Sequence, residues 1–132
     1  MTYALDTNAI IEYLNGRKTV ATKFLTVAKS GTPIVIPAVA DYEVMRGFYH
    51  TPCVDRQSNY NRMKVHCPTI DVNSSIWDCA AQIWSKLRKS RLTIGDADLI
   101  IAAQCLVNGY VLVTHNTKHF AVISGLQLDD WT

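Results

Sequence analysis

Hydrophobic and polar positions alternate along this chain in blocks that predict strands and helices in turn. Short apolar runs that end at turn residues predict strands, and apolar residues recurring every three or four positions predict helices. The predicted strands cover residues 2–5, 33–36, 68–70, 110–113 and 125–128, and the predicted helices cover residues 9–14, 19–29, 39–49, 55–66, 76–87 and 96–107. Strands that alternate with helices favour a central, mainly parallel sheet covered on both faces. The pattern therefore predicts an α/β fold with four to five short strands.

Capping residues mark the starts of several predicted helices. Thr19 is placed to cap the second helix, and Asn73 or Ser74 is placed to cap the long helix that follows. Asp96 precedes the most apolar helix, and the simplest role for this residue is that of N-cap. Because residues 99–103 are apolar on almost every face, we expect this helix to be buried.

Composition limits the classes of protein that the chain can represent. Its 132 residues suit a single domain spanning residues 1–132, and 48% hydrophobic residues are typical of a globular protein. A formal net charge of +2 is too small to indicate a nucleic-acid partner by itself. No signal peptide or membrane span is apparent, so we expect a cytoplasmic protein. The four cysteines show no C-x-x-C spacing, and we expect free thiols.

Acidic side chains stand where a parallel sheet would gather them. Asp6 follows the first predicted strand, Glu43 lies in the helix after the second, and Asp98 opens the buried helix. Each has a simpler explanation: Asp6 can end a strand, and Glu43 can pair with Arg46 three positions on. Carboxylates held close together repel one another, however, and a hard divalent cation such as Mg²⁺ or Mn²⁺ removes that repulsion. The pattern therefore indicates a metal site.

Four segments of this sequence together resemble the PIN domain. They are Leu5-Asp6-Thr7-Asn8, Tyr42-Glu43-Val44-Met45-Arg46-Gly47, Ile94-Gly95-Asp96-Ala97-Asp98-Leu99-Ile100-Ile101-Ala102-Ala103 and Val113-Thr114-His115-Asn116-Thr117-Lys118-His119-Phe120. Their order and spacing are similar to those of VapC toxins from bacterial type II toxin–antitoxin pairs, and the similarity covers the whole chain. The fold implied is the three-layer α/β/α sandwich of that family.

The resemblance implies a role for each acidic position. The metal ligands and catalytic acids of the family fall on Asp6, Glu43 and Asp98, and its fourth acidic position falls on Asn116. This asparagine removes one negative charge, so one tightly bound ion is favoured over two. The resemblance further implies polar support from residues Asn8 and Thr114 beside the metal, with Asp96 as a cap or an outer ligand.

The activity implied is that of a Mg²⁺- or Mn²⁺-dependent endoribonuclease that leaves a 5′-phosphate and a 3′-hydroxyl. Its substrate would be tRNA or another structured RNA, cut at a single-stranded loop. Basic side chains hold single-stranded RNA in many proteins, and Arg46, Lys118 and His115 are candidates here. The resemblance also implies a homodimer neutralised by a small VapB-like antitoxin. The helices at residues 19–29 and 42–66 are candidate surfaces for both contacts.

Three other interpretations are open to the sequence. A catalytically silent PIN-like module would bind RNA or protein without cutting, and Asn116 favours it, although three intact acids oppose it. Zinc could be bound by His50, Cys53, His66 and Cys67, but their spacing fits no common ligand pattern. An aspartyl nucleophile at Asp6 would require a second acid where Asn8 stands, so this interpretation is disfavoured too.

Overall fold

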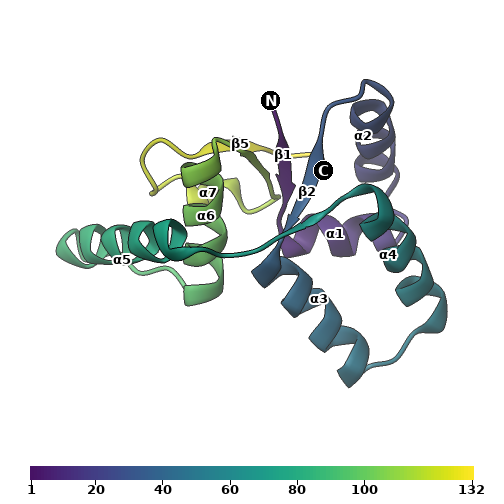
Figure 1. The fold of residues 1–132 in the computed structure, drawn as a ribbon, viewed down its shortest axis with the longest axis horizontal. Coiled ribbons are helices and arrows are strands. Elements are labelled where there is room, and N and C mark those ends of the chain that lie inside the picture. The colour runs from purple at the N-terminus through teal and green to yellow at the C-terminus, as the bar shows by residue number, and fades with distance from the viewer.

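The computed structural model describes all 132 residues and is built around a five-stranded parallel sheet. Its strands are β1 (Tyr3–Leu5), β2 (Ile34–Pro37), β3 (Thr69–Ile70), β4 (Val111–Val113) and β5 (Gln127–Asp129), in the spatial order β3-β2-β1-β4-β5. Strand β1 lies at the centre, paired with β2 on one side and β4 on the other (Figure 1). Because every pair is parallel, all five strands end at the same edge of the sheet. Residues that directly follow β1 and β4 therefore meet there.

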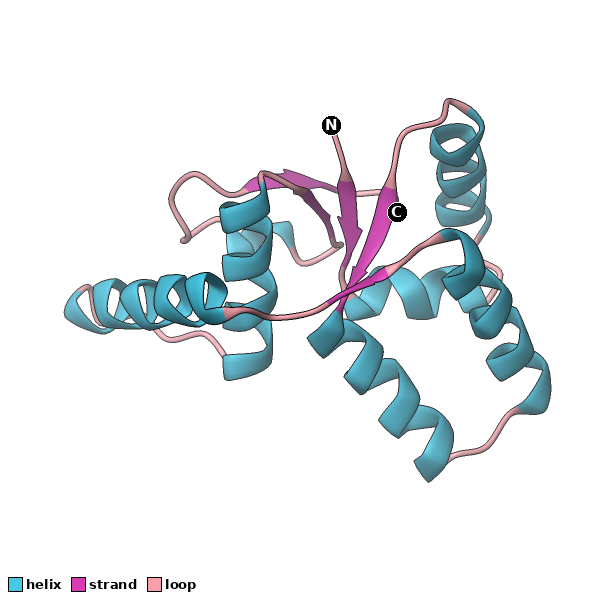
Figure 2. Ribbon diagram, viewed as in Figure 1, coloured by secondary structure: helices cyan, strands magenta, loops and turns pink.

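Seven helices surround this sheet (Figure 2). They are α1 (Thr7–Leu14), α2 (Lys18–Lys29), α3 (Ala38–His50), α4 (Val54–His66), α5 (Ser74–Lys89), α6 (Asp96–Asn108) and α7 (Thr117–Phe120). In Figure 1, α1 to α4 lie on one side of β1 and β2, whereas α5, α6 and α7 lie on the other. This arrangement confirms the α/β class and the flanked parallel sheet expected from the sequence.

The hydrophobic core falls into a large cluster and a small one. The large cluster of 23 buried residues joins the sheet to α1, α2, α3, α4 and α6. The small cluster of five residues, with Leu87 and Leu99 among its members, packs α5 against α6. Helix α6 contributes to both clusters, as its nearly uniform apolar sequence predicts. It thereby fixes the position of Asp98 relative to the sheet.

Two helices begin with a different N-cap residue from the one that the sequence predicted. Helix α2 begins at Lys18 with Arg17 at the N-cap, so the prediction of Thr19 as its cap is wrong. Asp96 is not a cap either, because Gly95 occupies the N-cap and Asp96 is the first helical residue. Asn73 caps α5 as predicted, since its side chain accepts a hydrogen bond from Ile76 N. The four-residue helix α7 was not predicted.

All four cysteines are free thiols, as expected. Cys67 and Cys105 are buried, and Cys53 and Cys79 are half-buried. None of the helices combines the length and the apolar character that a bilayer span requires.

Candidate active site

Asp6 lies at the end of the central strand and caps α1. Its backbone is extended, and its Oδ1 accepts a hydrogen bond of 2.8 Å from Thr7 N. Only 3% of the residue is exposed. A carboxylate that is buried this deeply is costly unless several donors satisfy it. Asp6 therefore requires partners from outside its own helix.

Those partners are Thr114 and Asn8, which form a hydrogen-bonded group with Asp6. Thr114 Oγ1 donates to Asp6 Oδ2 over 2.9 Å, and Asn8 Nδ2 donates to the same oxygen over 3.1 Å. Asn8 Nδ2 also lies 3.2 Å from Thr114 Oγ1. On the far side, the backbone of Asn116 donates to Thr114 Oγ1 and that of His115 donates to Asn8 Oδ1. The ends of β1 and β4 are thus locked together around one carboxylate.

Glu43 reaches the same edge of the sheet from α3. Its Oε1 accepts a hydrogen bond of 2.7 Å from Thr7 Oγ1, the first residue of α1. Its Oε2 lies 3.4 Å from the Arg46 guanidinium, the (i, i+3) pair that the sequence allowed as the simplest role for this acid. Thr7 therefore connects both acids, because its backbone donates to Asp6 and its hydroxyl donates to Glu43.

Asp98 projects from the first turn of α6. Its Oδ2 lies 3.0 Å from His119 Nε2, at the end of α7, and both side chains are partly exposed. Of the three acids, Asp98 has the most solvent-accessible side chain, with 36% exposed against 18% for Glu43. An accessible carboxylate beside two less accessible ones is suited to meet a substrate or a water molecule.

The charges of Asp98 and Glu43 act on the buried carboxylate of Asp6. Burial raises the pKa of Asp6 above its usual 3.8, the hydrogen bonds from Thr114 and Thr7 lower it, and the negative charges of Asp98 and Glu43 raise it again. The net direction is upward. The ionised form of Asp6 is therefore unfavourable, and a cation bound between the acids would stabilise it by attraction to all three carboxylates.

The donor set fits a hard divalent cation, although it does not enclose one. All three acids offer carboxylate oxygen, the ligand that Mg²⁺ and Mn²⁺ prefer. No three His, Cys, Asp or Glu side chains are grouped closely enough to hold a metal ion together. Mg²⁺ commonly keeps several waters and takes only one or two carboxylates from the protein, so this geometry is compatible with such a site. The same observation leaves the zinc interpretation without support.

The remaining predicted site residues are placed differently. Asn116 is exposed at the N-cap of α7, and its side chain makes no hydrogen bond within the protein. Lys118 and His115 are exposed nearby, whereas Arg46 is held between Glu43 and the ring of Tyr42. Asp96 lines a shallow pocket with Trp77 and Trp84 and is not the N-cap, whereas its role as an outer ligand stays a prediction.

Sequence reasoning missed two residues of this group. Thr7 lies inside a motif that was identified, but its contact with Glu43 depends on how α1 packs against α3. His119 lies in the short helix α7, which carries no periodic signal. Its position three residues after Asn116 was the only available hint.

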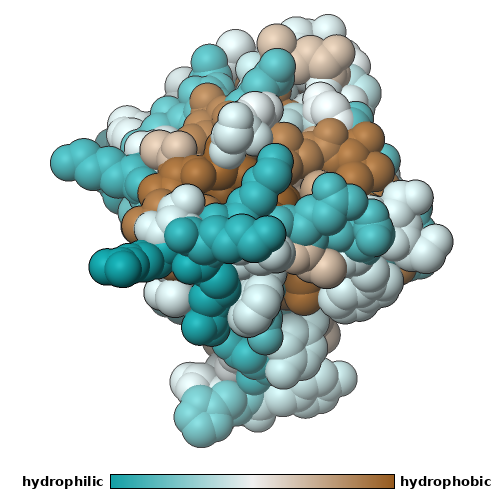
Figure 3. Space-filling model, turned by 90° about the vertical axis from the view of Figure 1, so that its left-hand side faces the viewer, coloured by the Kyte–Doolittle hydropathy of each residue, from teal (hydrophilic) through white to brown (hydrophobic).

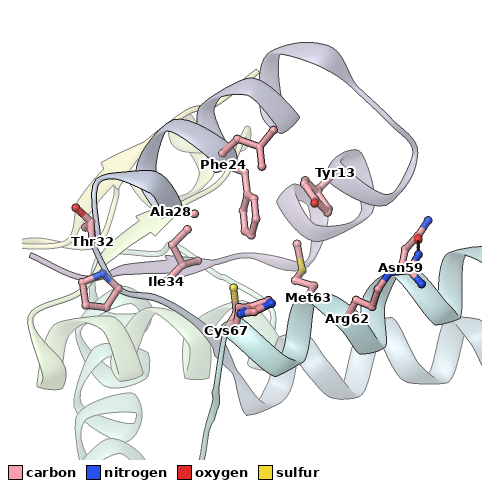
Figure 4. Close-up of a pocket in the computed structure, with 13 residues that line it drawn as sticks. Tyr13, Phe24, Ala28, Thr32, Ile34, Asn59, Arg62, Met63 and Cys67 are labelled. Carbon is pink, nitrogen blue, oxygen red and sulfur yellow. Dashed lines mark hydrogen bonds between the residues drawn. The ribbon is translucent and has the colours of Figure 1, made fainter.

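A larger pocket, of about 540 Å³, lies away from the acids, between α1, α2, β2 and α4 (Figure 4). Phe24, Ile34 and Met63 line its apolar interior, and Arg62 and Asn59 lie at one side. None of the three acids lines it. The pocket therefore belongs to a surface separate from the candidate active site.

Comparison with known proteins assigns the fold to a family. The PIN domain model matches residues 3–126 of the chain. The chain is 27% identical over 135 residues to Ribonuclease VapC1 of Haemophilus influenzae (strain R2866), covering 100% of this chain and 99% of the relative. The chain belongs to the PIN domain family.

Solved structures agree with this assignment. The structure of VapBC2 from Rickettsia felis, bound to a DNA fragment from its promoter, superimposes with a TM-score of 0.92 at 25% identity and covers 100% of both chains. The structure of VapBC-1 from nontypeable Haemophilus influenzae superimposes with a TM-score of 0.87 at 26% identity, covering 99% of this chain and 98% of that one.

Proposed function

We propose that the chain is the ribonuclease toxin of a VapBC-type pair, a single PIN domain that cuts RNA with the help of Mg²⁺ or Mn²⁺. The observation that carries this proposal is that Asp6, Glu43 and Asp98 converge on one edge of the sheet, near enough for the charges of Asp98 and Glu43 to act on Asp6. The end-to-end similarity to Ribonuclease VapC1 supports it. A protein that only bound RNA would gain nothing from clustered negative charge facing phosphates.

The cation would be held by Asp6, with Asp98 and Glu43 contributing directly or through water. When bound, it supplies the positive charge that orients the scissile phosphate, stabilises charge that develops there and lowers the pKa of a water molecule. Asp6 is kept in one orientation by Thr114 and Asn8. Asp98, the most accessible acid, takes the proton of the attacking water. The exposed Asn116 side chain, which has no hydrogen-bond partner within the protein, would contact the phosphate or that water.

The substrate we propose is tRNA or another structured RNA cut at a single-stranded loop. The exposed side chains of Lys118 and His115 flank Asn116 and would contact the phosphates on either side of the cut. Arg46 would join them once an incoming phosphate competes with Glu43 for its guanidinium. Such an enzyme acts in the cytoplasm, where tRNA is found.

The partners we propose are a VapB-like antitoxin and a second copy of this chain. Two exposed tryptophans on α5, Trp77 and Trp84, are 53% and 46% accessible and border a shallow pocket with Leu99 and Ile100 of α6. This surface lies outside the two helical segments that the sequence suggested for partner contacts. The face of the molecule at the α5 end has hydrophobic areas between hydrophilic side chains (Figure 3). The tryptophan surface supports a homodimer formed through α5 and α6.

The decisive experiment is cleavage of total bacterial RNA by the purified, antitoxin-free protein in Mg²⁺ or Mn²⁺. We expect discrete cuts that EDTA abolishes and that Asp6→Asn and Asp98→Asn both lose. Lys29→Ala, a change at the exposed C-terminal residue of α2 that forms no ion pair with any acid, serves as a control for the preparation of the variants. Folded wild-type protein that cuts no better than the two acid variants would instead establish a silent binding module.

A further inference from the structure

A small pocket shares Glu43 with the candidate active site. It has a volume of about 230 Å³ and lies between α1, α3 and the beginning of α4. Its walls are largely apolar, and its lining includes Glu43, Val44, Phe48, Asn15, Thr51 and Arg56, with Gly47 among them on α3. We call it the α1–α3 pocket. Pockets for drug-sized molecules have volumes of about 300–1,000 Å³, so this one suits a single ring system.

Gly47 leaves the α1–α3 pocket open. It lies in the interior of α3, one turn after Glu43, where glycine is less favourable than alanine. Its φ is not positive, so the backbone does not require glycine. A Cβ built at this position would meet no atom within 4 Å, so close packing does not require it either. The fold therefore gives no reason for a glycine here, whereas an occupant of the pocket does.

The charge around the pocket suits a nucleic acid. Arg56 lines the pocket and forms no ion pair, and Arg46 precedes Gly47 on α3 with Glu43 as its only ion-pair partner. The side chains of Asn15 and Thr51 also have no hydrogen-bond partner within the protein. Largely apolar walls that also carry amide, hydroxyl and guanidinium groups match the alternation of base and phosphate in RNA.

We propose that the α1–α3 pocket receives one nucleobase of the RNA substrate and thereby sets the base preference of cleavage. This proposal rests on the proposed ribonuclease function. The faces of the base would lie against Phe48 and Val44, and its polar edge would meet Asn15 and Thr51. Arg56 would pair with the adjoining phosphate. Because Glu43 belongs to both sites, a base held here would lie beside the phosphodiester bond that is cut.

The test fills the α1–α3 pocket by placing a larger side chain at position 47. Wild type, Gly47→Ala, Gly47→Leu and Ser58→Leu are compared, the last adding the same side chain to an exposed helix position that does not line the pocket. Circular dichroism and thermal unfolding first establish that each variant is folded. The probe is a pool of short single-stranded RNA oligonucleotides of random sequence, cut in Mn²⁺, with the product ends sequenced.

We expect wild type and Ser58→Leu to favour one base at one position beside the cut. Gly47→Leu should lose that preference and cut the favoured sequence about tenfold more slowly or worse, the loss expected when one base no longer stacks. Gly47→Ala should show a smaller loss of rate together with a higher melting temperature, because alanine is the better helix former.

A Gly47→Leu variant that keeps the wild-type rate and base preference overturns the pocket assignment and leaves the ribonuclease function intact. Equally, a variant that cuts normally but no longer binds the antitoxin assigns the pocket to the protein partner. Binding of the same random oligonucleotide pool in EDTA, which needs no cleavage, separates the two proposals. If wild type binds but never cuts, while Gly47→Leu binds about tenfold more weakly, the pocket stands and the ribonuclease function fails.

Discussion

Thr114 donates a hydrogen bond of 2.9 Å to Asp6, although the two residues are 108 positions apart in the chain. The bond joins the ends of two neighbouring strands, β1 and β4, and it is fully buried. It also opposes the effect of burial on Asp6, because a hydrogen bond to the ionised carboxylate lowers its pKa. The same hydroxyl therefore contributes both to stability and to the charge state of the site.

Replacing this hydroxyl should affect stability and activity together. We expect Thr114→Val to lower the free energy of unfolding by about 1–3 kcal/mol, since it leaves a buried carboxylate short of a donor. The acid limb of the pH profile of kcat/KM should move to higher pH, because the pKa of Asp6 rises when the bond is lost. Thr114→Ser keeps the donor and should resemble wild type. An acid limb unchanged in Thr114→Val would contradict the role given to this bond.

Asp6 itself should destabilise the fold at neutral pH. Its pKa is raised above 3.8 in the folded protein, so folding favours the protonated form. The stability of wild type relative to Asp6→Asn should therefore fall as pH rises above 3.8, and level off once pH exceeds the folded pKa. Urea unfolding of both proteins across this range, without divalent cations, measures the difference. If the stabilities of the two proteins instead change in parallel with pH, the pKa of Asp6 is not raised by folding.

The effect of added Mg²⁺ on thermal stability provides a second comparison of wild type with Asp6→Asn. A cation that binds only the folded protein raises its stability by mass action. We expect added Mg²⁺ or Mn²⁺ to raise the melting temperature of wild type and to leave that of Asp6→Asn unchanged. NaCl at matched ionic strength controls for general screening. An equal rise in both proteins would place the bound ion elsewhere.

The two exposed tryptophans of α5 should control self-association. We expect the double variant Trp77→Ser and Trp84→Ser to be monomeric where wild type is dimeric, because each removes a large apolar area from the proposed interface. Light scattering after size-exclusion chromatography measures the mass. Tyr49→Ser, which removes an aromatic residue that is 81% exposed on α3, should leave the mass unchanged. A double variant with the mass of wild type would exclude this surface.

Cysteine accessibility provides a separate check on the core. Burial raises the pKa of the Cys67 thiol to about 11 and that of Cys105 to about 12. Neither thiol forms appreciable thiolate near neutral pH, and thiolate is the reactive form. We expect Cys53 to react first with a thiol reagent in the folded protein and Cys79 to react more slowly, because burial also raises the pKa of the half-buried Cys79 thiol. All four should react after unfolding. Mass spectrometry identifies the labelled positions, and early labelling of Cys105 would conflict with the packing of α6.

Much of this fold could be predicted from the sequence because short apolar runs and helical periodicity reflect burial directly. The positions of Asp6 and Thr114 followed as well, since both come directly after strands whose carboxyl ends must share an edge. The partner of Asp98 could not be predicted, because His119 lies in a four-residue helix that has no periodic pattern. Nor could the contact between Thr7 and Glu43, which depends on the crossing of two helices. The capping role of Asp96 failed for a local reason, because Gly95 occupies that position.

The order of strands in the sheet also has a consequence for the synthesis of the protein. The central strand β1 emerges from the ribosome first, but its neighbour β4, with Thr114 directly after it, is among the last segments made. Until then Asp6 lacks its main hydrogen-bond donor and the edge of the sheet is incomplete. A nascent chain on the ribosome therefore carries no assembled cutting site. The RNA cleavage that we propose for this site would therefore begin only when the chain is nearly finished.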